Sequence, residues 1–417
     1  MPSDGESFVR RTRVVIVGGG QSGLAMSACL SERGLDHVVL ERGRIGERWQ
    51  SERWDSLRLL TPNWLSRLPR WTYGGPDPRG YMSAHEVARH LEAYARHIAA
   101  PVEDGTTVVA VQRAGGSYRV VTEAAGRRAV WLAASVVIAT GACDVPNVPA
   151  LAAGLPPDVH QLVPARYRRP ADLPDGGVLV VGASASGVQL ADELVRAGRP
   201  TTLSVGRHVR LARRYRGRDI MAWLEAAGIL DERIDDSRDL EGARRQPSFQ
   251  LVADRTLDLP ALAAAGVRLV GRVVGADGAR VALAPDLEAT ARDADARLRR
   301  LLDRIDAFAG GAPGPRPAPF VPPPAPEAID LRADGIATVL WSTGYRRAYP
   351  WLEVPVVDGH GELVLRGGIP AAPGLVALGL PFLRRRKSSF LDGVGGDAAE
   401  LADHLATYLE GRPPMAA

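Results

Sequence analysis

Lysine is almost missing from this chain. Of its 52 basic residues, Lys387 is the one lysine and all the others are arginine. The net charge is only +4 over 417 residues. Nucleic-acid-binding proteins carry a clustered basic face, which arginines scattered along the whole chain do not predict. We therefore expect no nucleic-acid partner, and a single lysine argues against Schiff-base chemistry.

Cysteine and long apolar runs are scarce as well. Cys29 and Cys143 are the two cysteines, too few for a disulfide framework and typical of a reducing cytoplasm. No run of about 18 apolar residues occurs, which argues against a transmembrane helix. The polar stretch Met1–Arg13 does not have the apolar core of a signal peptide. We expect a cytoplasmic protein without membrane contact.

The length and the hydrophobic pattern indicate a globular α/β protein. The chain is 46% apolar and 24% charged, and at roughly 150 residues per domain it should form two or three domains with sizeable cores. Short β-branched runs alternate with helical patterns, which predicts parallel sheets. Strands are expected at residues 13–17, 37–41, 107–111, 118–122, 135–139, 177–181, 201–205, 267–270, 337–341 and 375–378. Helices are expected at residues 24–33, 83–98, 291–309 and about 398–410, with one more ending near 197.

The first strand runs directly into a glycine-rich turn, Gly18-Gly19-Gly20-Gln21-Ser22-Gly23. In this spacing Gly18 permits the tight turn, Gly20 lets the backbone approach a pyrophosphate, and Gly23 lets helix and strand pack closely. The start of the following helix supplies N–H groups for the phosphates. Glu41 ends the next strand, where an acid binds an unphosphorylated ribose. The pattern predicts a dinucleotide site that suits the adenosine half of FAD.

A second turn, Gly182-Ala183-Ser184-Ala185-Ser186-Gly187, follows another apolar strand and opens another helix. Ser184 is small enough for the same close approach of a phosphate. The next strand ends without an acid and offers Ser204, Arg207 and His208 instead. Arginine and serine bind a 2′-phosphate that a carboxylate would repel. This second site therefore indicates NADPH rather than NADH, with an ordinary surface role for Arg207 as the alternative.

Two such sites on one chain imply hydride transfer from a nicotinamide to a flavin. A disulfide reductase is not expected, because Cys29 and Cys143 form no closely spaced pair. His85, His90 and His97 lack metal-ligand spacing, so no metal site is expected. The basic run Arg384–Lys387 has no interleaved aromatics and indicates a solvated loop or an anion contact.

In their order along the chain these motifs resemble the flavin-containing monooxygenases, the class that also holds the Baeyer–Villiger enzymes and the plant auxin-forming enzymes. Besides the two glycine turns, similar segments are 45–49, 54–63, 139–141, 341–345 and 378–382. The resemblance implies two Rossmann-like dinucleotide-binding domains. An FAD domain of residues 1–165 and 327–417 would be interrupted by an NADPH domain of residues 166–326.

The resemblance also implies particular site residues. Cofactor contacts are implied for the two turns and for Glu41, Arg42, Arg48, Trp49, Thr61, Thr140, Gly141, Ser204, Arg207, Thr343, Gly344 and Tyr345. Asn63 is a candidate catalytic residue, as the asparagine nearest to the family's catalytic position. Tyr167 is a second candidate, because with His160 it matches the end of a degraded family signature.

The implied reaction begins when NADPH reduces FAD, and dioxygen then forms a flavin hydroperoxide that oxygenates a small organic substrate. The tryptophan of a Baeyer–Villiger signature does not follow His160, which favours oxygenation at nitrogen or sulfur. A Baeyer–Villiger reaction, with Arg213, Arg214 and Arg216 as candidate cations, stays open. So do an NADPH-dependent flavin reductase that serves a partner protein, a nucleotide-binding sensor without catalysis, and a homodimer.

Overall fold

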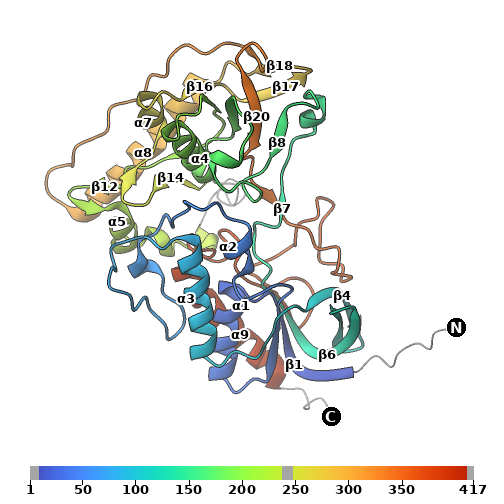
Figure 1. Cartoon of the computed structure of the whole chain (residues 1–417). Helices are drawn as coiled ribbons and strands as arrows, with labels where there is room; N and C mark the ends of the chain where they lie inside the picture. Colours follow the sequence, from blue (N-terminus) through green and yellow to red (C-terminus); the bar gives the residue numbers. More distant parts are fainter. Residues whose placement is uncertain (1–8, 237–247, 411–417) are drawn as a thin grey trace.

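A computed structural model describes residues 9–236 and 248–410, and its ribbon forms two lobes (Figure 1). The lower lobe contains a seven-stranded sheet in the order β3-β2-β1-β6-β5-β4, with β22 paired to β6. These strands are β1 (Val9–Val17), β2 (His37–Leu40), β3 (Val102–Glu103), β4 (Thr107–Ala114), β5 (Ser117–Ala124), β6 (Arg127–Ile138) and β22 (Leu375–Ala377). Strands β3, β2, β1, β6 and β22 are parallel, and β4 and β5 add an antiparallel extension.

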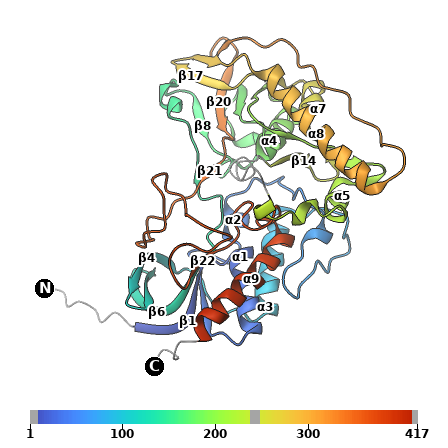
Figure 2. The ribbon, with the colours of Figure 1, turned by 180° about the vertical axis from the view of Figure 1, so that it is seen from behind.

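Both faces of this sheet are buried, because successive side chains of its strands point into two different cores. Helices cover one of the two faces. Val14 and Ile16 of β1 face the core under the helices, whereas Val15 and Val17 face the core on the other side. The helices are α1 (Gln21–Glu32), α3 (Ala84–His97) and α9 (Leu391–Glu410), with the short α2 (Glu47–Ser51) above them. Seen from behind, α9 crosses the lobe and packs against α1 (Figure 2).

The upper lobe is built on a second sheet in the order β16-β10-β9-β20-β8, in which every pair is parallel. Its strands are β8 (His160–Leu162), β9 (Gly177–Val181), β10 (Thr201–Ser204), β16 (Arg268–Val270) and β20 (Ile336–Trp341). Its helices are α4 (Ala185–Arg196), α5 (Ile220–Ala226), α7 (Leu259–Ala264) and α8 (Leu287–Ala309). The expected α/β fold with parallel sheets is confirmed.

Short elements complete the two lobes. The small strands are β7 (Val145–Pro146), β11 (Val209–Arg210), β12 (Arg214–Tyr215), β13 (Arg218–Asp219), β14 (Phe249–Val252), β15 (Arg255–Thr256), β17 (Val273–Asp277), β18 (Arg280–Leu283), β19 (Ala328–Asp330) and β21 (Tyr345–Arg346). The 3-10 turns are η1 (Asn63–Leu65), η2 (Ala150–Gly154), η3 (Pro170–Asp172), η4 (Ile229–Asp231) and η5 (Ile234–Asp236).

The strand pairing differs from the expected boundaries at 165 and 327. Strand β20 hydrogen-bonds to β9 and β8, and β19 pairs with β18, so all of these belong to the upper lobe. The chain therefore crosses between β6 and β8 and returns between β20 and β22. Both sheets accept apolar parallel strands, so the sequence pattern of β20 does not reveal which sheet it joins. At the crossing, β7 and β21 form a two-stranded antiparallel link.

The last helix begins earlier than the expected start near 398. Helix α9 starts at Leu391 and includes Gly393, Gly395 and Gly396, residues that disfavour helix formation. A Cβ at Gly393 would lie 1.7 Å from the Lys387 carbonyl oxygen, and one at Gly395 would lie 3.1 Å from Pro69 Cδ. Close packing of this first turn therefore requires glycine where propensity predicts no helix.

A fully buried arginine joins the two lobes. Arg213, whose side chain is 2% exposed, makes a two-pronged ion pair with Asp219, with Nη2 2.6 Å from Oδ1. Its Nη1 donates to the Leu60 carbonyl of the lower lobe at 2.7 Å, and its guanidinium lies over the Tyr81 ring at 4.9 Å. The Tyr81 hydroxyl donates to the same Asp219. Every polar atom of this joint thus has a partner across or beside the lobe boundary.

The basic run near the C-terminus is neither a solvated loop nor a site for an outside anion. Arg384 and Arg385 pair with Glu400 on α9, and Arg385 also pairs with the buried Asp397 at 2.6 Å. Arg386 and Lys387 reach carboxylates of the upper lobe, Glu232 at 2.7 Å and Asp231 at 3.0 Å. The run is therefore an internal ion-pair network that spans both lobes.

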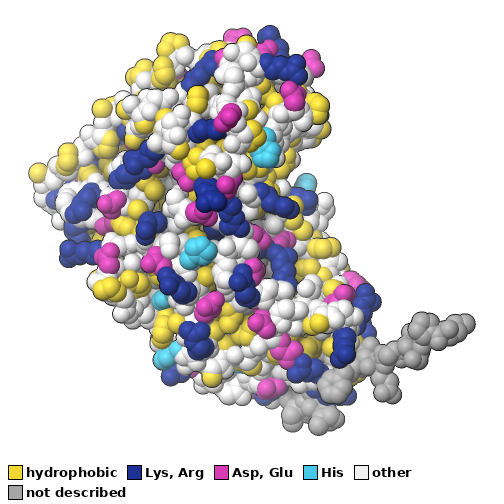
Figure 3. Space-filling view, in the orientation of Figure 1, with side chains coloured by type: hydrophobic (Ala, Val, Ile, Leu, Met, Phe, Trp, Pro, Cys, Tyr) yellow, Lys and Arg dark blue, Asp and Glu magenta, His cyan; other side chains and the backbone are white. Residues whose placement is uncertain are grey.

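Charges of both signs are interspersed on the face in Figure 3, so the arginines there lie among acids. Within the described part of the chain, no helix has the length and apolarity needed to cross a membrane. Among the same residues no group of three or more His, Cys, Asp or Glu side chains is arranged to hold a metal ion.

Replacing Arg213 by methionine should destabilise the fold strongly. The Asp219 carboxylate, which is 23% exposed, would lose its charge partner, and leaving a partly buried charge unpaired costs up to about 3 kcal/mol. Arg214→Met is the matched control, because Arg214 is exposed and donates one hydrogen bond, to Gly217. We expect a much lower thermal midpoint for Arg213→Met than for Arg214→Met. Equal midpoints would show that the contacts of Arg213 with Asp219, Leu60 and Tyr81 contribute little to stability.

Candidate functional site

The first glycine turn lies against the end of a neighbouring strand. A Cβ at Gly18, where φ is +111°, would come within 2.6 Å of the Ala139 carbonyl oxygen. A Cβ at Gly23 would come within 1.9 Å of the Gly18 carbonyl oxygen. At Gly20, by contrast, a Cβ would meet no neighbouring atom within 4 Å. Gly18 and Gly23 are thus required because a side chain at either position would overlap the backbone. Gly20 instead borders open space that a side chain would fill, and a pyrophosphate site needs such space beside the backbone.

The second turn repeats this geometry on the upper sheet. Gly182, with φ of +107°, would place a Cβ 2.4 Å from the Ser342 carbonyl oxygen, at the end of β20. A Cβ at Gly187 would lie 1.8 Å from the Gly182 carbonyl oxygen. Ser184 occupies the position of Gly20 and begins α4 in an extended conformation. Each lobe therefore has one turn, packed against the strand that leads into the β7–β21 link.

The helices that follow the two turns differ from the others in how they begin. Helix α3 has a full capping box from Ser83 and Glu86, and α5 and α7 are capped by Asp219 and Asp258. Among the described helices, only α1 and α4 have neither a side-chain cap nor an acid in the first turn. Their free N–H groups and positive dipole ends suit phosphates.

Glu41 is fixed beside the first turn, as the sequence predicts. Its Oε2 accepts a hydrogen bond from Gly19 N at 2.6 Å, and its Oε1 accepts one from Gly43 N at 2.9 Å. Each carboxylate oxygen keeps a further lone pair, so the residue can still accept from a ribose diol. The residues present therefore fit the adenosine half of FAD.

The end of β6 brings several expected site residues together. Arg48 on α2 donates to the Thr140 carbonyl at 3.2 Å and pairs with Asp144, and Gly141 lies directly beside its guanidinium. Arg42 is exposed, 3.8 Å from Asp144. Trp49 and Thr61 are half-buried, and the Trp49 ring lies under the Arg53 guanidinium. Arg48 therefore connects α2 to the segment that follows β6.

The β7–β21 link between the lobes fixes the residues that follow β20. Asn147 N donates to the Gly344 carbonyl at 2.9 Å, and the Thr343 hydroxyl donates to the Asn147 carbonyl. Tyr345 lies in β21 opposite Pro146, and burial raises the pKa of its phenol. Thr343 and Gly344 are thus held next to the second turn by the link itself.

The C-terminal segment returns to the first turn. A Cβ at Gly379, where φ is +79°, would lie 2.0 Å from the Ser22 hydroxyl. The Gln21 side chain donates to the Ser389 carbonyl at 2.8 Å. Residues 379–389 therefore contact the start of α1, a contact between chain ends that local sequence patterns do not reveal.

Ser204 is a structural residue and does not face a ligand. It is 1% exposed, and its hydroxyl donates to the Gly271 carbonyl and accepts from Val273 N, both at 3.1 Å. The expectation of a phosphate-binding serine is therefore corrected, because both hydrogen-bonding functions serve the end of β16. Arg207 is exposed on the loop after β10, where the sequence places it.

Neither candidate catalytic residue is available for catalysis. Asn63 is 4% exposed, and its amide donates to the Asp77 carbonyl at 2.9 Å and accepts from Met82 N at 2.8 Å. Tyr167 is 1% exposed and packs in the core under α4, where burial raises the pKa of its phenol. Asn63 joins two loop segments and Tyr167 fills a core, so both expectations are corrected.

Arg168, which follows Tyr167, connects the two lobes through hydrogen bonds, a role that the sequence analysis did not assign to it. Arg168 donates to the carbonyls of Ser51 and Arg53 in the lower lobe, and its own carbonyl accepts from Asp55 N at 3.1 Å. Its place in the degraded signature was the available signal. The Trp54 side chain, next in the chain after Arg53, packs in the upper-lobe core.

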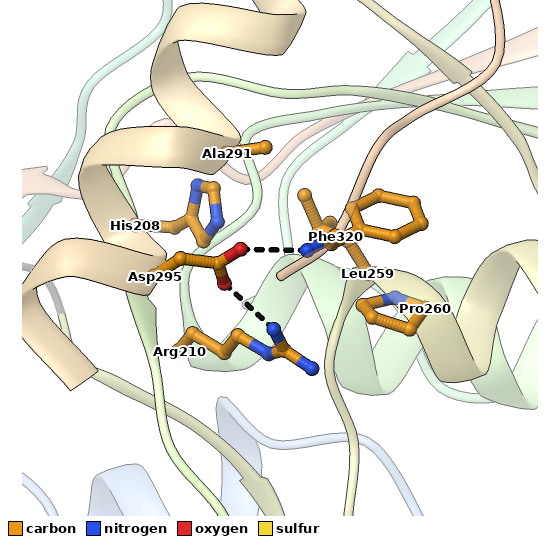
Figure 4. Close-up of a pocket in the computed structure, with 7 residues that line it drawn as sticks. All are labelled: His208, Arg210, Leu259, Pro260, Ala291, Asp295 and Phe320. Carbon is orange, nitrogen blue, oxygen red and sulfur yellow. Dashed lines mark hydrogen bonds and ion pairs between the residues drawn. The ribbon is translucent and has the colours of Figure 1, made fainter. Parts of the chain in front are cut away.

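A small depression in the upper lobe is lined by residues of the loop after β10, of α7 and α8, and of the connector (Figure 4). Asp295 of α8 accepts from Arg210 Nη1 and from Phe320 N, both at 2.6 Å. His208 is buried beside them, and burial lowers its pKa, which keeps its ring neutral at pH 7. These contacts fasten the proline-rich connector, residues 313–326, onto α8 and support the loop that carries Arg207.

The two cysteines do not form a redox pair. Cys29 is buried in α1, where burial, the largest cause, raises the pKa of its thiol to about 11. Such a thiol is protonated at neutral pH and is a poor nucleophile. Cys143 is half-buried after the end of β6, and both residues are free thiols.

Substitutions at two glycines of the first turn should separate a loss of cofactor binding from a loss of folding. Gly20→Val should fold with a near-normal thermal midpoint, because its side chain enters open space, yet it should purify without FAD. Gly23→Ala is the contrasting variant and should fold poorly, because its Cβ would overlap the Gly18 carbonyl. Flavin absorbance per protein and circular dichroism measure the two properties. A fully flavin-loaded Gly20→Val protein would overturn the assignment of the first turn.

Comparisons with known proteins agree with this geometry. A profile of the pyridine nucleotide-disulphide oxidoreductase family matches residues 15–227. An uncharacterized CzcO-like oxidoreductase of Geobacillus kaustophilus is 30% identical over 399 residues, which cover 95% of this chain and 98% of that protein. A probable indole-3-pyruvate monooxygenase of Arabidopsis thaliana is 34% identical over 186 residues, 44% of each chain.

The likeness extends to solved structures. A flavin-containing monooxygenase from Stenotrophomonas maltophilia superposes with a TM-score of 0.67 at 24% identity, over 96% of this chain and 99% of that chain. It confirms the fold expected from the motif order, with two dinucleotide-binding units. The chain therefore belongs to the pyridine nucleotide-disulphide oxidoreductase family and is an oxidoreductase.

Proposed function

We propose that this protein is an FAD- and NADPH-dependent monooxygenase that oxygenates a small organic molecule at nitrogen or sulfur. One observation carries the proposal. Two turns of the same geometry, one followed by an acid-ended strand and one by an acid-free strand, pack against strands that run into a common link. A flavin site and a nicotinamide site that lie on either side of one link would allow hydride transfer between the two cofactors.

The residues of the chain have separate roles in this proposal. FAD would be held by the Gly18–Gly23 turn, the start of α1 and Glu41, and NADPH by the Gly182–Gly187 turn, the start of α4 and Arg207. When bound, the flavin supplies electron transfer and the activation of dioxygen. The segment at 379–389 contacts the start of α1 through Gly379 and Ser389 and would help to hold the phosphate-binding turn in place.

Two alternatives lose support from the side chains. A disulfide reductase needs an accessible pair of reactive thiols, whereas Cys29 is buried with a raised pKa. A Baeyer–Villiger reaction needs an available cation beside the flavin. Arg213 and Arg216 are ion-paired with Asp219 and Asp306, and Arg214 is exposed on the β12–β13 hairpin. These pairings favour oxygenation at nitrogen or sulfur.

Isotope labelling tests the reaction. The FAD-loaded protein is incubated with NADPH, labelled dioxygen and a panel of amines and thioethers. We expect product that contains labelled oxygen, in amounts equimolar with the NADPH consumed. A reductase would instead leave the organic compounds unlabelled and pass its electrons to dioxygen, which gives labelled hydrogen peroxide, or to an added ferredoxin. A sensor would not oxidise NADPH.

Selectivity for the 2′-phosphate tests the second site. Arg207→Ala should weaken NADPH binding about tenfold through loss of a charged hydrogen bond, while NADH binding stays near its original value. Arg196→Ala is the control, because Arg196 is an exposed arginine near the far end of α4 that pairs with Asp192. Equal effects of Arg207→Ala on both nucleotides would remove the proposed role.

A further inference from the structure

The end of β16 is tied to the end of β10 by Ser204. Residues Ser204 and Val270 are directly paired, and Val205 N donates to the Val270 carbonyl at 2.9 Å. The buried Ser204 hydroxyl then binds Gly271 and Val273 on either side of Arg272. Because the strands are parallel, Arg272 lies at the same sheet edge as Arg207 and the second glycine turn, whose Gly182 N donates to the Ser204 carbonyl.

The backbone of Arg272 is held on both sides. Its N–H donates to Asp286 Oδ1 at 3.0 Å, and its carbonyl accepts from Ala284 N at 2.8 Å. A Cβ at the preceding Gly271 would lie 1.9 Å from the Ala284 carbonyl oxygen. The loop can therefore approach Ala284 this closely only because residue 271 is glycine and has no side chain.

The Nε side of the Arg272 guanidinium lies beside an acid, and most of the side chain is exposed. Its Nε lies 3.3 Å from Asp286 Oδ2, and the side chain is 64% exposed. Within residues 9–236 and 248–410, neither Nη group of Arg272 donates a hydrogen bond, and its ion pair with Asp286 is made at Nε. Asp286 thus restrains the guanidinium and leaves the two terminal nitrogens available for an anion.

We propose that Arg272 is a second specificity-determining residue, which binds the 2′-phosphate of NADPH together with Arg207. The ribose of a dinucleotide lies at the end of the second strand of its binding unit, here β10, and Arg272 comes from the adjacent strand end. Guanidinium groups bind phosphate oxygens through two parallel N–H bonds. Ser204, which a sequence pattern suggests as a phosphate ligand, instead positions the loop that carries this arginine.

This inference rests on the proposed NADPH site and is independent of the oxygenation reaction. Its test is therefore a binding measurement with 2′,5′-ADP and 5′-AMP as probes, made by calorimetry on the FAD-loaded protein. The variants are Arg272→Ala, Arg272→Gln, Arg207→Ala and the double replacement of Arg272 and Arg207 by alanine. Arg268→Ala is the matched control, since Arg268 begins the same strand at the opposite sheet edge and pairs with Asp334 at 3.0 Å.

We expect Arg272→Ala and Arg272→Gln to weaken 2′,5′-ADP binding about tenfold, the value of one charged hydrogen bond, with 5′-AMP binding nearly unchanged. Arg268→Ala should alter neither affinity. Because both arginines would contact one phosphate, the loss in the double variant should differ from the sum of the single losses.

Three results would overturn the inference. Arg272 variants that bind both probes like the unsubstituted protein, or that weaken both equally, would show that Arg272 does not contact the phosphate. An unsubstituted protein without preference for 2′,5′-ADP would remove the NADPH site, and this inference with it. A protein that shows the Arg272 effect but gives no oxygenated product would instead overturn the proposed reaction alone.

Discussion

The close contact between a glycine turn and the end of the neighbouring strand is the constraint on which the rest of the structure depends. Gly18 rests on Ala139, and Gly182 rests on Ser342, at distances that leave no room for a side chain. Each contact places the uncapped start of a helix at the carboxyl edge of its sheet, where phosphates bind. It also places that edge next to the strand that leaves for the other lobe. One local geometry, used twice, therefore creates both candidate nucleotide sites and joins them through β7 and β21.

Arginine side chains make several of the contacts between the lobes. Arg213 binds a carboxylate and a carbonyl while its plane covers an aromatic ring, and Arg168 binds two carbonyls at once. These contacts use the planar fork of the guanidinium, which a lysine does not have. Arg384, Arg385 and Arg386 continue the pattern along α9 and into the upper lobe. The extreme preference for arginine over lysine thus has a structural use at these positions, in addition to any compositional bias.

Local patterns predicted the elements and the turns well. The six-residue glycine spacings and the flanking apolar strands are contiguous in sequence, so Gly18 and Gly23 could be assigned specific backbone roles and the second turn could be recognised as a similar site. Helix α3 likewise followed from its capping box. The predictions failed where a residue's partner lies far along the chain. Ser204 and Asn63 have polar side chains in plausible places, but their hydrogen bonds go to Gly271 and Asp77, and the sequence contains no record of those approaches.

By itself the sequence determined an α/β chain with two dinucleotide-type turns, an acid after one and an arginine after the other. It did so because tight turns, buried strands and helix starts depend on residues that are close neighbours in the chain. Only the tertiary structure decided that β20 belongs to the upper sheet and that residues 379–389 contact the first turn. It also decided that Tyr167 is a core residue and that Arg272 stands at the edge beside Arg207. These outcomes depend on pairings between distant strands, whose hydrogen bonds and packing are formed only when the whole chain has folded.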